Sequence, residues 1–262
     1  MQIVSVSSLK GGVGKSSVTL GIASAALRAG VPTLVVDLDP HADATTGLGV
    51  QPERGHDVGE ALRRPRRGAL ERVVVASAWA VREGLDAKAL DVAPGSARSS
   101  HLERSEFRDK DLGRLERVLA GVPGYDLVLV DCPPTLSALT RTAWAASDKV
   151  LSVAEPSLFS VAGTKRTMTA IAQFEQSRSW AVPSAGVVVN KVQHASVEHR
   201  HRLEELRELF GPLLVNPVIP DLPVWQQAQG AAWPIHRWPG SEAEDLSGRF
   251  TAILRGLLDR SP

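Results

Sequence analysis

Residues 10–17, Lys-Gly-Gly-Val-Gly-Lys-Ser-Ser, lie between a β-rich run at Gln2–Val6 and a long apolar-periodic segment at Ser16–Ala29. Glycines permit a sharp turn in which successive backbone N–H groups face phosphate oxygens, and the start of a helix adds partial positive charge. Lys15 would offset the charge of β- and γ-phosphates, and the Ser16 hydroxyl would bind Mg²⁺. The stretch predicts a phosphate-binding loop (P-loop) between a strand and a helix. Its predicted contact residues are Gly11, Gly12, Val13, Gly14, Lys15, Ser16 and Ser17.

Short apolar runs alternate with helical patterns along the rest of the chain. The further strands are expected at Thr33–Val36, Ala89–Ala93, Leu127–Val130, Lys149–Ala154 and Gly186–Val189. The further helices are expected at Asp111–Ala120, Leu136–Ala146, Gly163–Gln176 and Val197–Phe210. Continuous apolar runs are typical of strands buried on both faces, and their alternation with helices predicts right-handed crossovers. We therefore expect an α/β fold, a mostly parallel twisted β-sheet with helices on both faces.

Composition narrows the class of protein. The 262 residues are 43% apolar and 23% charged, which is ordinary globular usage. The net charge of +1 gives no global field that points to nucleic acid or to an anionic membrane. The one cysteine, Cys132, excludes a disulfide framework within the chain and a four-thiolate cluster on one chain. With no run of 18 apolar residues and no signal-peptide pattern, we expect a cytoplasmic protein.

Carboxylates follow two of the expected strands. Asp37 and Asp39 end the second strand at i and i+2, so both point to one side of the chain. Asp131 follows the run Leu127–Val130 and is followed by Cys132-Pro133-Pro134. An Asp in this position lies near the P-loop, where it can hold Mg²⁺ through a water molecule or through Ser16.

The string KGGVGKSS, with its extra lysine Lys10, resembles the deviant Walker A motif of the ParA/MinD group of ATPases, also called the SIMIBI class, and especially that of the ParA/Soj chromosome-partitioning ATPases. No internal repeat and no long linker divides the chain, so one domain is expected over residues 1–262. The resemblance implies that it is a P-loop ATPase domain with the P-loop NTPase fold, and that its cofactors are ATP and Mg²⁺. It also implies a nucleotide-sandwich homodimer that forms on ATP binding. In such a dimer Lys10 would reach the phosphates of the partner's ATP, much as an arginine finger does.

Two further strings match the family. DLDPHADAT at 37–45 resembles the switch I pattern DxDPQGNAT, and DCPP at 131–134 resembles the Walker B strand end. The resemblance makes Asp39 the residue that positions the attacking water. His41, Ala42 and Asp43 depart from the pattern and would alter the rate of hydrolysis. The implied catalytic residues are Lys10, Lys15 and Asp39, and the implied Mg²⁺ site is formed by Ser16, Asp39 and Asp131.

The base-binding residues are expected late in the chain. Asn190 ends the strand at Gly186–Val189, and Pro220 lies in the segment Val218-Ile219-Pro220-Asp221. In related ATPases an Asn at this place holds the adenine edge and a Pro-containing segment covers the ring. Asn190 as a simple helix cap or turn residue is the alternative.

The resemblance also implies partners: nonspecific DNA, an activator of the ParB type, and association with the nucleoid. Two basic strips are candidates for DNA phosphate contacts, each with a solvated charged face as its alternative. The first strip is Arg63, Arg64, Arg66 and Arg67, and the second is Lys191, Arg200, Arg202, Arg207 and Arg237. The apolar stripe of the last helix fits packing against the sheet, so a membrane partner is not expected. That stripe is Leu246, Phe250, Ile253, Leu254, Leu257 and Leu258.

The leading hypothesis is a ParA-like ATPase that binds Mg-ATP, dimerises and hydrolyses ATP to switch a DNA- or cargo-positioning state in chromosome or plasmid partitioning. The alternative is a MinD-like or regulatory nucleotide switch that acts on a protein or membrane partner without DNA. An iron–sulfur carrier would need clustered thiolates, and the chain has one cysteine. A tyrosine autokinase of this fold carries a C-terminal tyrosine cluster, and Tyr125 is the only tyrosine here.

Overall fold

The computed structural model describes residues 1–85, 88–100, 102, 111–176 and 184–259. The strands are β1 (Gln2–Ser7), β2 (Thr33–Asp37), β3 (Val75–Ala76), β4 (Leu90–Ala93), β5 (Leu127–Asp131), β6 (Lys149–Ala154), β7 (Ser184–Val189) and β8 (Leu214–Val215). They form one sheet in the order β3-β4-β2-β5-β1-β6-β7-β8. Neighbouring strands are parallel except for β3 and β4, which are antiparallel. The predicted α/β fold with a mostly parallel sheet is confirmed.

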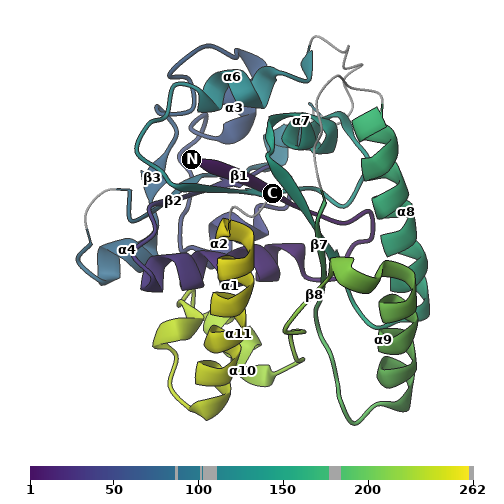
Figure 1. Cartoon of the computed structure of the whole chain (residues 1–262). Helices are drawn as coiled ribbons and strands as arrows, with labels where there is room; N and C mark the ends of the chain where they lie inside the picture. Colours follow the sequence, from purple (N-terminus) through teal and green to yellow (C-terminus); the bar gives the residue numbers. More distant parts are fainter. Residues whose placement is uncertain (86–87, 101, 103–110, 177–183, 260–262) are drawn as a thin grey trace.

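Helices cover both faces of this sheet (Figure 1). The α-helices are α1 (Lys15–Arg28), α2 (Asp43–Gly47), α3 (Val58–Arg63), α4 (Ala78–Arg82), α6 (Arg114–Leu119), α7 (Ala138–Ala146), α8 (Leu158–Gln176), α9 (Val197–Phe210), α10 (Pro223–Gly230) and α11 (Ser241–Leu258). Short 3₁₀ turns are η1 (Ala97–Ser99), η3 (Gly211–Leu213) and η4 (Ile235–Arg237).

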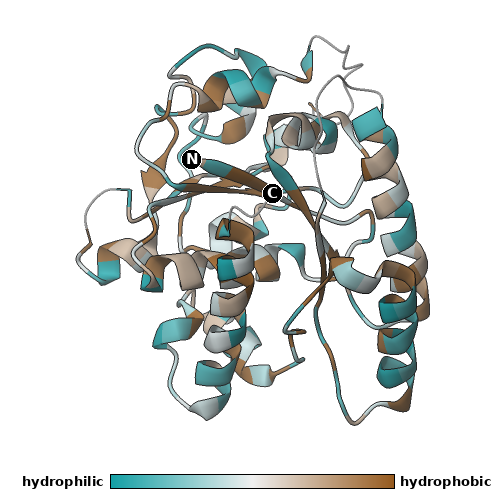
Figure 2. Cartoon of the chain, viewed as in Figure 1, coloured by the Kyte–Doolittle hydropathy of each residue, from teal (hydrophilic) through white to brown (hydrophobic). Residues whose placement is uncertain are grey.

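Alternate side chains of each central strand enter two different cores. On β2, Leu34 and Val36 face a core shared with α3, α6 and α7, whereas Val35 faces a core shared with α1, α10 and α11. Figure 2 shows brown, hydrophobic strands at the centre of the molecule, with teal, hydrophilic residues on the helices around them. A strand with both faces covered must be apolar at every position, which explains the continuous runs in the sequence.

The final helix, α11, completes the second core by packing on α1. The ring of Phe250 lies so close to Gly21 that a Cβ added to Gly21 would be 2.2 Å from it. The sequence predicted packing against the sheet. In the structure α11 packs mainly on α1, which covers that face of the sheet, and its last turn reaches the sheet, where the Leu257 carbonyl accepts from Gln2 Nε2 of β1 and Lys149 Nζ of β6.

The order of the strands places the P-loop at the middle of the sheet. β1 lies between β5 and β6, so the chain turns from one half of the sheet to the other beside it. Ligands of open α/β sheets bind at such a switch point, outside the carboxyl ends of the strands. The P-loop follows the carboxyl end of β1, and Asp37, Asp131 and Asn190 end or follow β2, β5 and β7 at the same edge.

The predicted elements are found with shifted ends. α8 begins at Leu158, five residues before the expected Gly163. The sequence pattern missed its first turn because Leu158 and Phe159 are apolar but exposed, which breaks the apolar period of the helix. The stretch from Gly49 to Gly84, for which the sequence predicted no helix or strand, contains α3, β3 and α4. Of the first basic strip, Arg63 ends α3, and Arg64, Arg66 and Arg67 lie exposed in the loop that follows.

Candidate nucleotide-binding site

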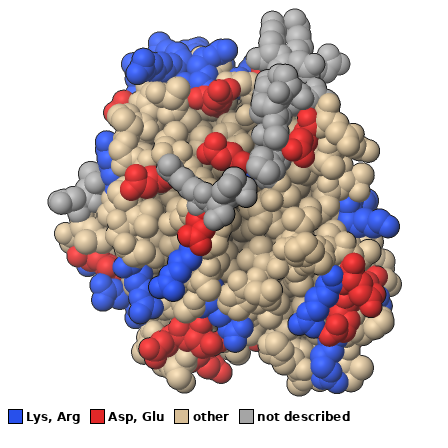
Figure 3. Space-filling model, viewed as in Figure 1, with Lys and Arg blue, Asp and Glu red and all other residues tan. Residues whose placement is uncertain are grey.

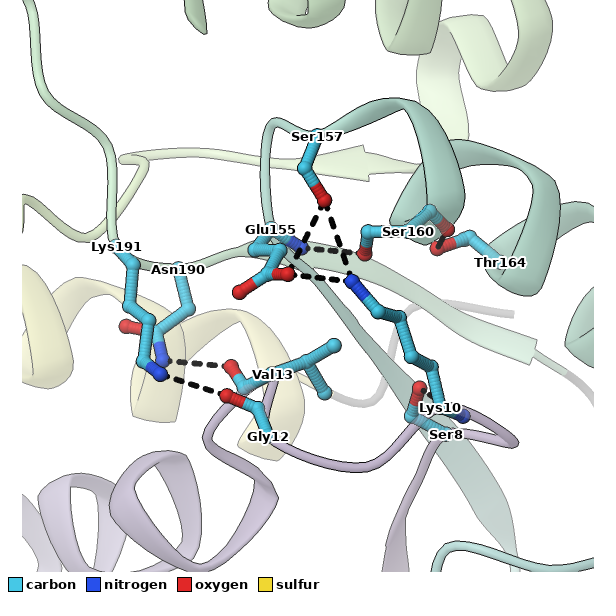
Figure 4. Close-up of polar contacts among 10 residues, drawn as sticks. All are labelled: Ser8, Lys10, Gly12, Val13, Glu155, Ser157, Ser160, Thr164, Asn190 and Lys191. Carbon is cyan, nitrogen blue, oxygen red and sulfur yellow. Dashed lines mark hydrogen bonds and ion pairs between the residues drawn. The ribbon is translucent and has the colours of Figure 1, made fainter.

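The P-loop is held in place by the two residues that follow β7. Asn190 Nδ2 donates to the carbonyl of Val13 at 2.9 Å, and Lys191 Nζ donates to the carbonyl of Gly12 at 2.6 Å (Figure 4). Gly14 has φ +89°, and a Cβ there would lie 2.2 Å from Asn190 Nδ2. Glycine is therefore required at this position for two reasons, the left-handed backbone and the close approach of a buried amide.

A cleft of about 620 Å³ opens over this loop. Its walls come from the P-loop, the start of α1, the segment after β2 and the end of α10. The residues that line it are Gly11, Gly12, Gly14, Lys15, Ser16, Ser17, Leu20, Asp39, His41, Asp43, Thr46, Gly47, Pro134, Lys191, Gln229 and Gly230. Most of the predicted site residues thus meet in one cleft, while Lys10, Val13, Asp131, Asn190 and Pro220 lie outside its lining.

Asp131 is buried beneath the start of α1. It accepts hydrogen bonds from Ser16 Oγ at 2.6 Å and from Thr19 Oγ1 at 3.1 Å. Burial raises the pKa of Asp131 to about 6, with the Ser16 hydrogen bond acting in the opposite direction. A buried carboxylate with a raised pKa gains from a cation brought beside it. The donor set of a hydroxyl and a carboxylate fits Mg²⁺, which is bound through one or two carboxylates together with phosphate oxygens.

Asp37 lies directly beside Asp131, since the two are register partners on β2 and β5. Burial, and next the charge of Asp131, raise the pKa of Asp37 to about 8. Asp37 Oδ2 accepts from the backbone N–H of Thr45 at 2.8 Å and from its hydroxyl at 2.6 Å. The Thr45 hydroxyl in turn accepts from Gly95 N at 2.9 Å. Asp37 therefore fixes the fold of the segment from 37 to 45.

Asp39 faces the cleft and is engaged by a residue that departs from the family pattern. Its Oδ1 accepts from the backbone N–H of His41 at 3.0 Å and lies 2.9 Å from His41 Nδ1. The His41 side chain is 76% exposed and that of Asp39 is 8% exposed. The imidazole thus stands between the carboxylate and solvent.

Lys10 projects from the P-loop toward the start of α8 (Figure 4). Its Nζ lies 2.5 Å from Glu155 Oε1 and 3.3 Å from Ser157 Oγ. Ser160 Oγ accepts from the backbone N–H of Glu155 at 2.9 Å, which fixes the turn between β6 and α8. Glu155 lies in none of the motifs recognised in the sequence. Its only signal was a carboxylate directly after the buried strand β6, the same pattern that marked Asp37 and Asp131.

Late-chain residues lie at the same edge without lining the cleft. Asn190 supports the P-loop backbone through its bond to Val13. The sequence had suggested two other roles for Asn190, an adenine contact or a helix cap. Pro220 forms a parallel bridge with Val192, and Ile219 N donates to Val189 O at 2.8 Å. The segment around Pro220 is therefore fixed beside the end of β7.

Cys132 follows Asp131 in the core formed with α3, α6 and α7. It is fully buried, and burial together with the charge of Asp131 raises the pKa of its thiol to about 12. A thiol in such surroundings is a packing residue.

The family of the chain follows from its match to a protein-family model. A protein-family model described as an AAA domain matches residues 1–182, more than half of the sequence. The chain belongs to this family of P-loop ATPases. Its motifs place it in the ParA/MinD-type group, as the sequence predicted. ATPase activity with ATP and Mg²⁺ is characteristic of the group.

Among curated relatives, the chain is 28% identical over 229 residues to the chromosome partitioning protein ParA of Caulobacter vibrioides, covering 84% of this chain and 80% of that protein. Two solved structures share the fold of this P-loop ATPase. A point variant of Cyanothece McdA in complex with ATP has a TM-score of 0.84 at 19% identity and covers 100% of this chain and 98% of the other. Cobyrinic acid a,c-diamide synthase from Mycobacterium smegmatis with a bound ATP analog and magnesium has a TM-score of 0.74 at 22% identity, covering 88% and 93%.

Two other kinds of feature are absent from the described residues. None of the helices in that part of the chain is long and apolar enough to cross a membrane. No group of three or more His, Cys, Asp or Glu side chains in the same residues is arranged to hold a metal ion.

Proposed function

We propose that this P-loop ATPase is a ParA-like switch: it binds Mg-ATP, forms a nucleotide-sandwich homodimer, and hydrolyses ATP to change a DNA- or cargo-positioning state. The observation that carries the proposal is the meeting of Lys15, Ser16 and Asp39 in one cleft with Lys10 on the adjoining loop. The 28% identity to a chromosome partitioning protein supports the same role. In this proposal residues 1–262 act as one P-loop ATPase domain.

Each residue has a distinct task in the proposed cycle. The backbone N–H groups of the P-loop and the Lys15 ammonium bind the phosphates, and Ser16 and Asp131 would hold Mg²⁺. The ion, when bound, offsets phosphate charge. Asp39 orients the attacking water, and it would contribute to the Mg²⁺ shell. Asn190 supports the loop, and Asn190 and Pro220 are proposed to bind the base.

The dimer face is proposed to lie around Lys10. Leu158 and Phe159, at the start of α8, are 53% and 76% exposed. They follow Ser157, which contacts Lys10, and a Cβ added to Gly163 of the same helix would lie 3.3 Å from Lys10 Cβ. Exposed large apolar side chains beside a functional lysine favour a surface that another protein covers.

Nucleotide binding and dimerisation are tested together. Light scattering would be measured on wild type, Lys10→Ala and Lys15→Ala with ATP, with ADP and without nucleotide. We expect a dimer only for wild type with ATP, loss of ATP binding for Lys15→Ala, and ATP binding without dimers for Lys10→Ala. Wild type that stays monomeric at saturating ATP would overturn the proposed switch.

The alternative, a MinD-like or regulatory switch without DNA, makes a different prediction for the same protein. It predicts ATP-dependent dimers that do not bind duplex DNA even at low salt. Addition of duplex DNA to the light-scattering samples therefore separates the two functions, and a ParB-like activator is expected only for the first.

A further inference from the structure

We infer that the arginine surface formed by Arg64, Arg66, Arg67 and Arg72, and not helix α9, is where this protein contacts the phosphodiester backbone of nucleic acid. The inference rests on the proposed DNA-positioning function and names the surface that would carry it. Figure 3 shows Lys and Arg side chains gathered over the part of the molecule where α3 and α6 lie.

The four arginines are exposed and have no ion pair with any described residue. Residues 64–72 carry a single acid, Glu71, so this short segment has a net charge of +3. Arg64, Arg66 and Arg72 also line a cleft of about 190 Å³ together with Glu60, whose carboxylate is paired with Arg63. Within the described part of the chain, their guanidinium groups can bind phosphate without first breaking an ion pair.

The second basic strip contains a similar number of positive residues, but these residues are bound to partners within the chain. Arg202 pairs with Glu198 and Glu205, and Arg207 pairs with Glu204, at 2.6 to 2.8 Å. The other three members of the strip also have partners. Lys191 donates to the carbonyl of Gly12, and Arg200 donates to the carbonyls of His194 and Ala195. Arg237 pairs with Glu83. A phosphate that approached α9 would compete with these partners and would meet their negative charge.

The arginine surface is held on a firm support. Gly68 has φ +77°, and its backbone N would lie 2.3 Å from a Cβ placed on Gly121, so the loop rests on the chain just after α6. Ala69 and Leu70 are buried in the core beneath it. Side chains on a fixed loop lose less backbone entropy on binding than those on a disordered arm.

The partner that fits the arginine surface is a nucleic acid backbone and not a lipid surface. Between residues 51 and 74, all of which the structure describes, no large apolar side chain is exposed. Stable membrane attachment combines basic charge with apolar groups that enter the bilayer, and such groups are missing from this stretch. Backbone phosphates need charge alone, and they give binding without sequence preference.

The experiment compares two triple variants that remove equal positive charge. Arg64→Ala/Arg66→Ala/Arg67→Ala and the matched control Arg200→Ala/Arg202→Ala/Arg207→Ala would be tested with ATP on immobilised duplex DNA across a salt series. For the first variant we expect weaker binding and a slope of log K against log salt that is smaller by roughly 0.9 per lost contact. The control variant is expected to keep the wild-type slope.

A third variant, Arg64→Lys/Arg66→Lys/Arg67→Lys, keeps the charge and should keep most of the slope, which separates charge from misfolding. Dimerisation with ATP, measured by light scattering on all variants, tests the proposed switch independently. Loss of the salt slope in the α9 variant instead of the loop variant would overturn the inference. So would wild-type dimers that bind vesicles of phosphatidylglycerol but not DNA, or that bind neither, and in both cases the dimer switch would stand.

Discussion

Lys10 and Glu155 form an ion pair of 2.5 Å within one chain, although they are 145 residues apart in the sequence. Lys10 is the residue that the family resemblance assigns to the partner's nucleotide. In the isolated chain the Lys10 ammonium is bound by Glu155 and Ser157 of the same chain. The side chains of Lys10 and Glu155 are partly exposed, at 26% and 21%. An ion pair of this exposure is weak, so Lys10 can leave Glu155 to bind a phosphate.

Glu155→Gln is expected to increase the affinity for ATP. The substitution removes a negative charge beside the P-loop and releases the Lys10 ammonium. An ion pair of this exposure contributes roughly 0.2–1 kcal/mol, so the Kd for ATP should fall by about 1.4- to 5-fold. Titration calorimetry on wild type, Glu155→Gln, Lys10→Ala and the double variant would give the coupling between the two residues. An unchanged Kd in Glu155→Gln would show that the pair does not restrain Lys10.

Two glycines of the P-loop are expected to tolerate alanine differently. Gly12 and Gly14 both have positive φ, but only at Gly14 would a Cβ meet another residue, Asn190 Nδ2 at 2.2 Å. Gly12→Ala should therefore lower the free energy of unfolding by about 1–2 kcal/mol through backbone strain alone. Gly14→Ala should lower it further and displace Asn190 from Val13. Denaturant unfolding of the two variants checks this order, and equal losses would contradict the close approach.

His41→Gln is expected to raise the basal rate of ATP hydrolysis. Loss of the imidazole frees Asp39 Oδ1 from one hydrogen bond, so the carboxylate becomes available to water. One hydrogen bond is worth about 0.5–1.5 kcal/mol, which corresponds to an increase of roughly 2- to 12-fold. Steady-state phosphate release would be measured at saturating ATP, with Asp39→Ala as the inactive control. A rate equal to or below that of wild type would show that His41 does not restrain Asp39.

His236 is expected to make stability depend on pH on the acid side. Its Nδ1 lies 2.8 Å from Ser24 Oγ and its Nε2 lies 3.1 Å from Glu83 Oε1, and burial lowers its pKa below the ordinary 6.5. The unfolded chain therefore binds a proton more readily than the folded chain, and this contribution to stability is lost as the pH falls below about 6.5.

The measurement compares the Tm of wild type and His236→Gln between pH 7.5 and pH 5. Wild type should lose Tm more steeply than the variant on the acid side, since only wild type carries this titration. Parallel curves would mean that the nearby Glu83 charge cancels the effect of burial.

Much of the site could be predicted because its residues are neighbours in the sequence or follow apolar strands. The P-loop is a local turn whose glycines and charges are contiguous, and Asp37, Asp39 and Asp131 each follow a recognisable run. The bond from Asn190 to Val13 could not be predicted, since it depends on how β7 is placed relative to the P-loop. The short α3, α4 and β3 were also missed, because elements of two to six residues carry too little periodicity.

The parallel α/β fold and the phosphate chemistry of residues 10–17 follow from the sequence, because local backbone preference and burial on both faces act along the chain. Which charges are paired depends on the packing of the folded chain. It joined Lys10 to Glu155, and it neutralised arginines of α9 while leaving Arg64 and Arg66 without an ion pair among the described residues. Ion pairs depend on distances of a few ångströms, and between segments far apart in the chain these distances are fixed only when the sheet and its helices pack.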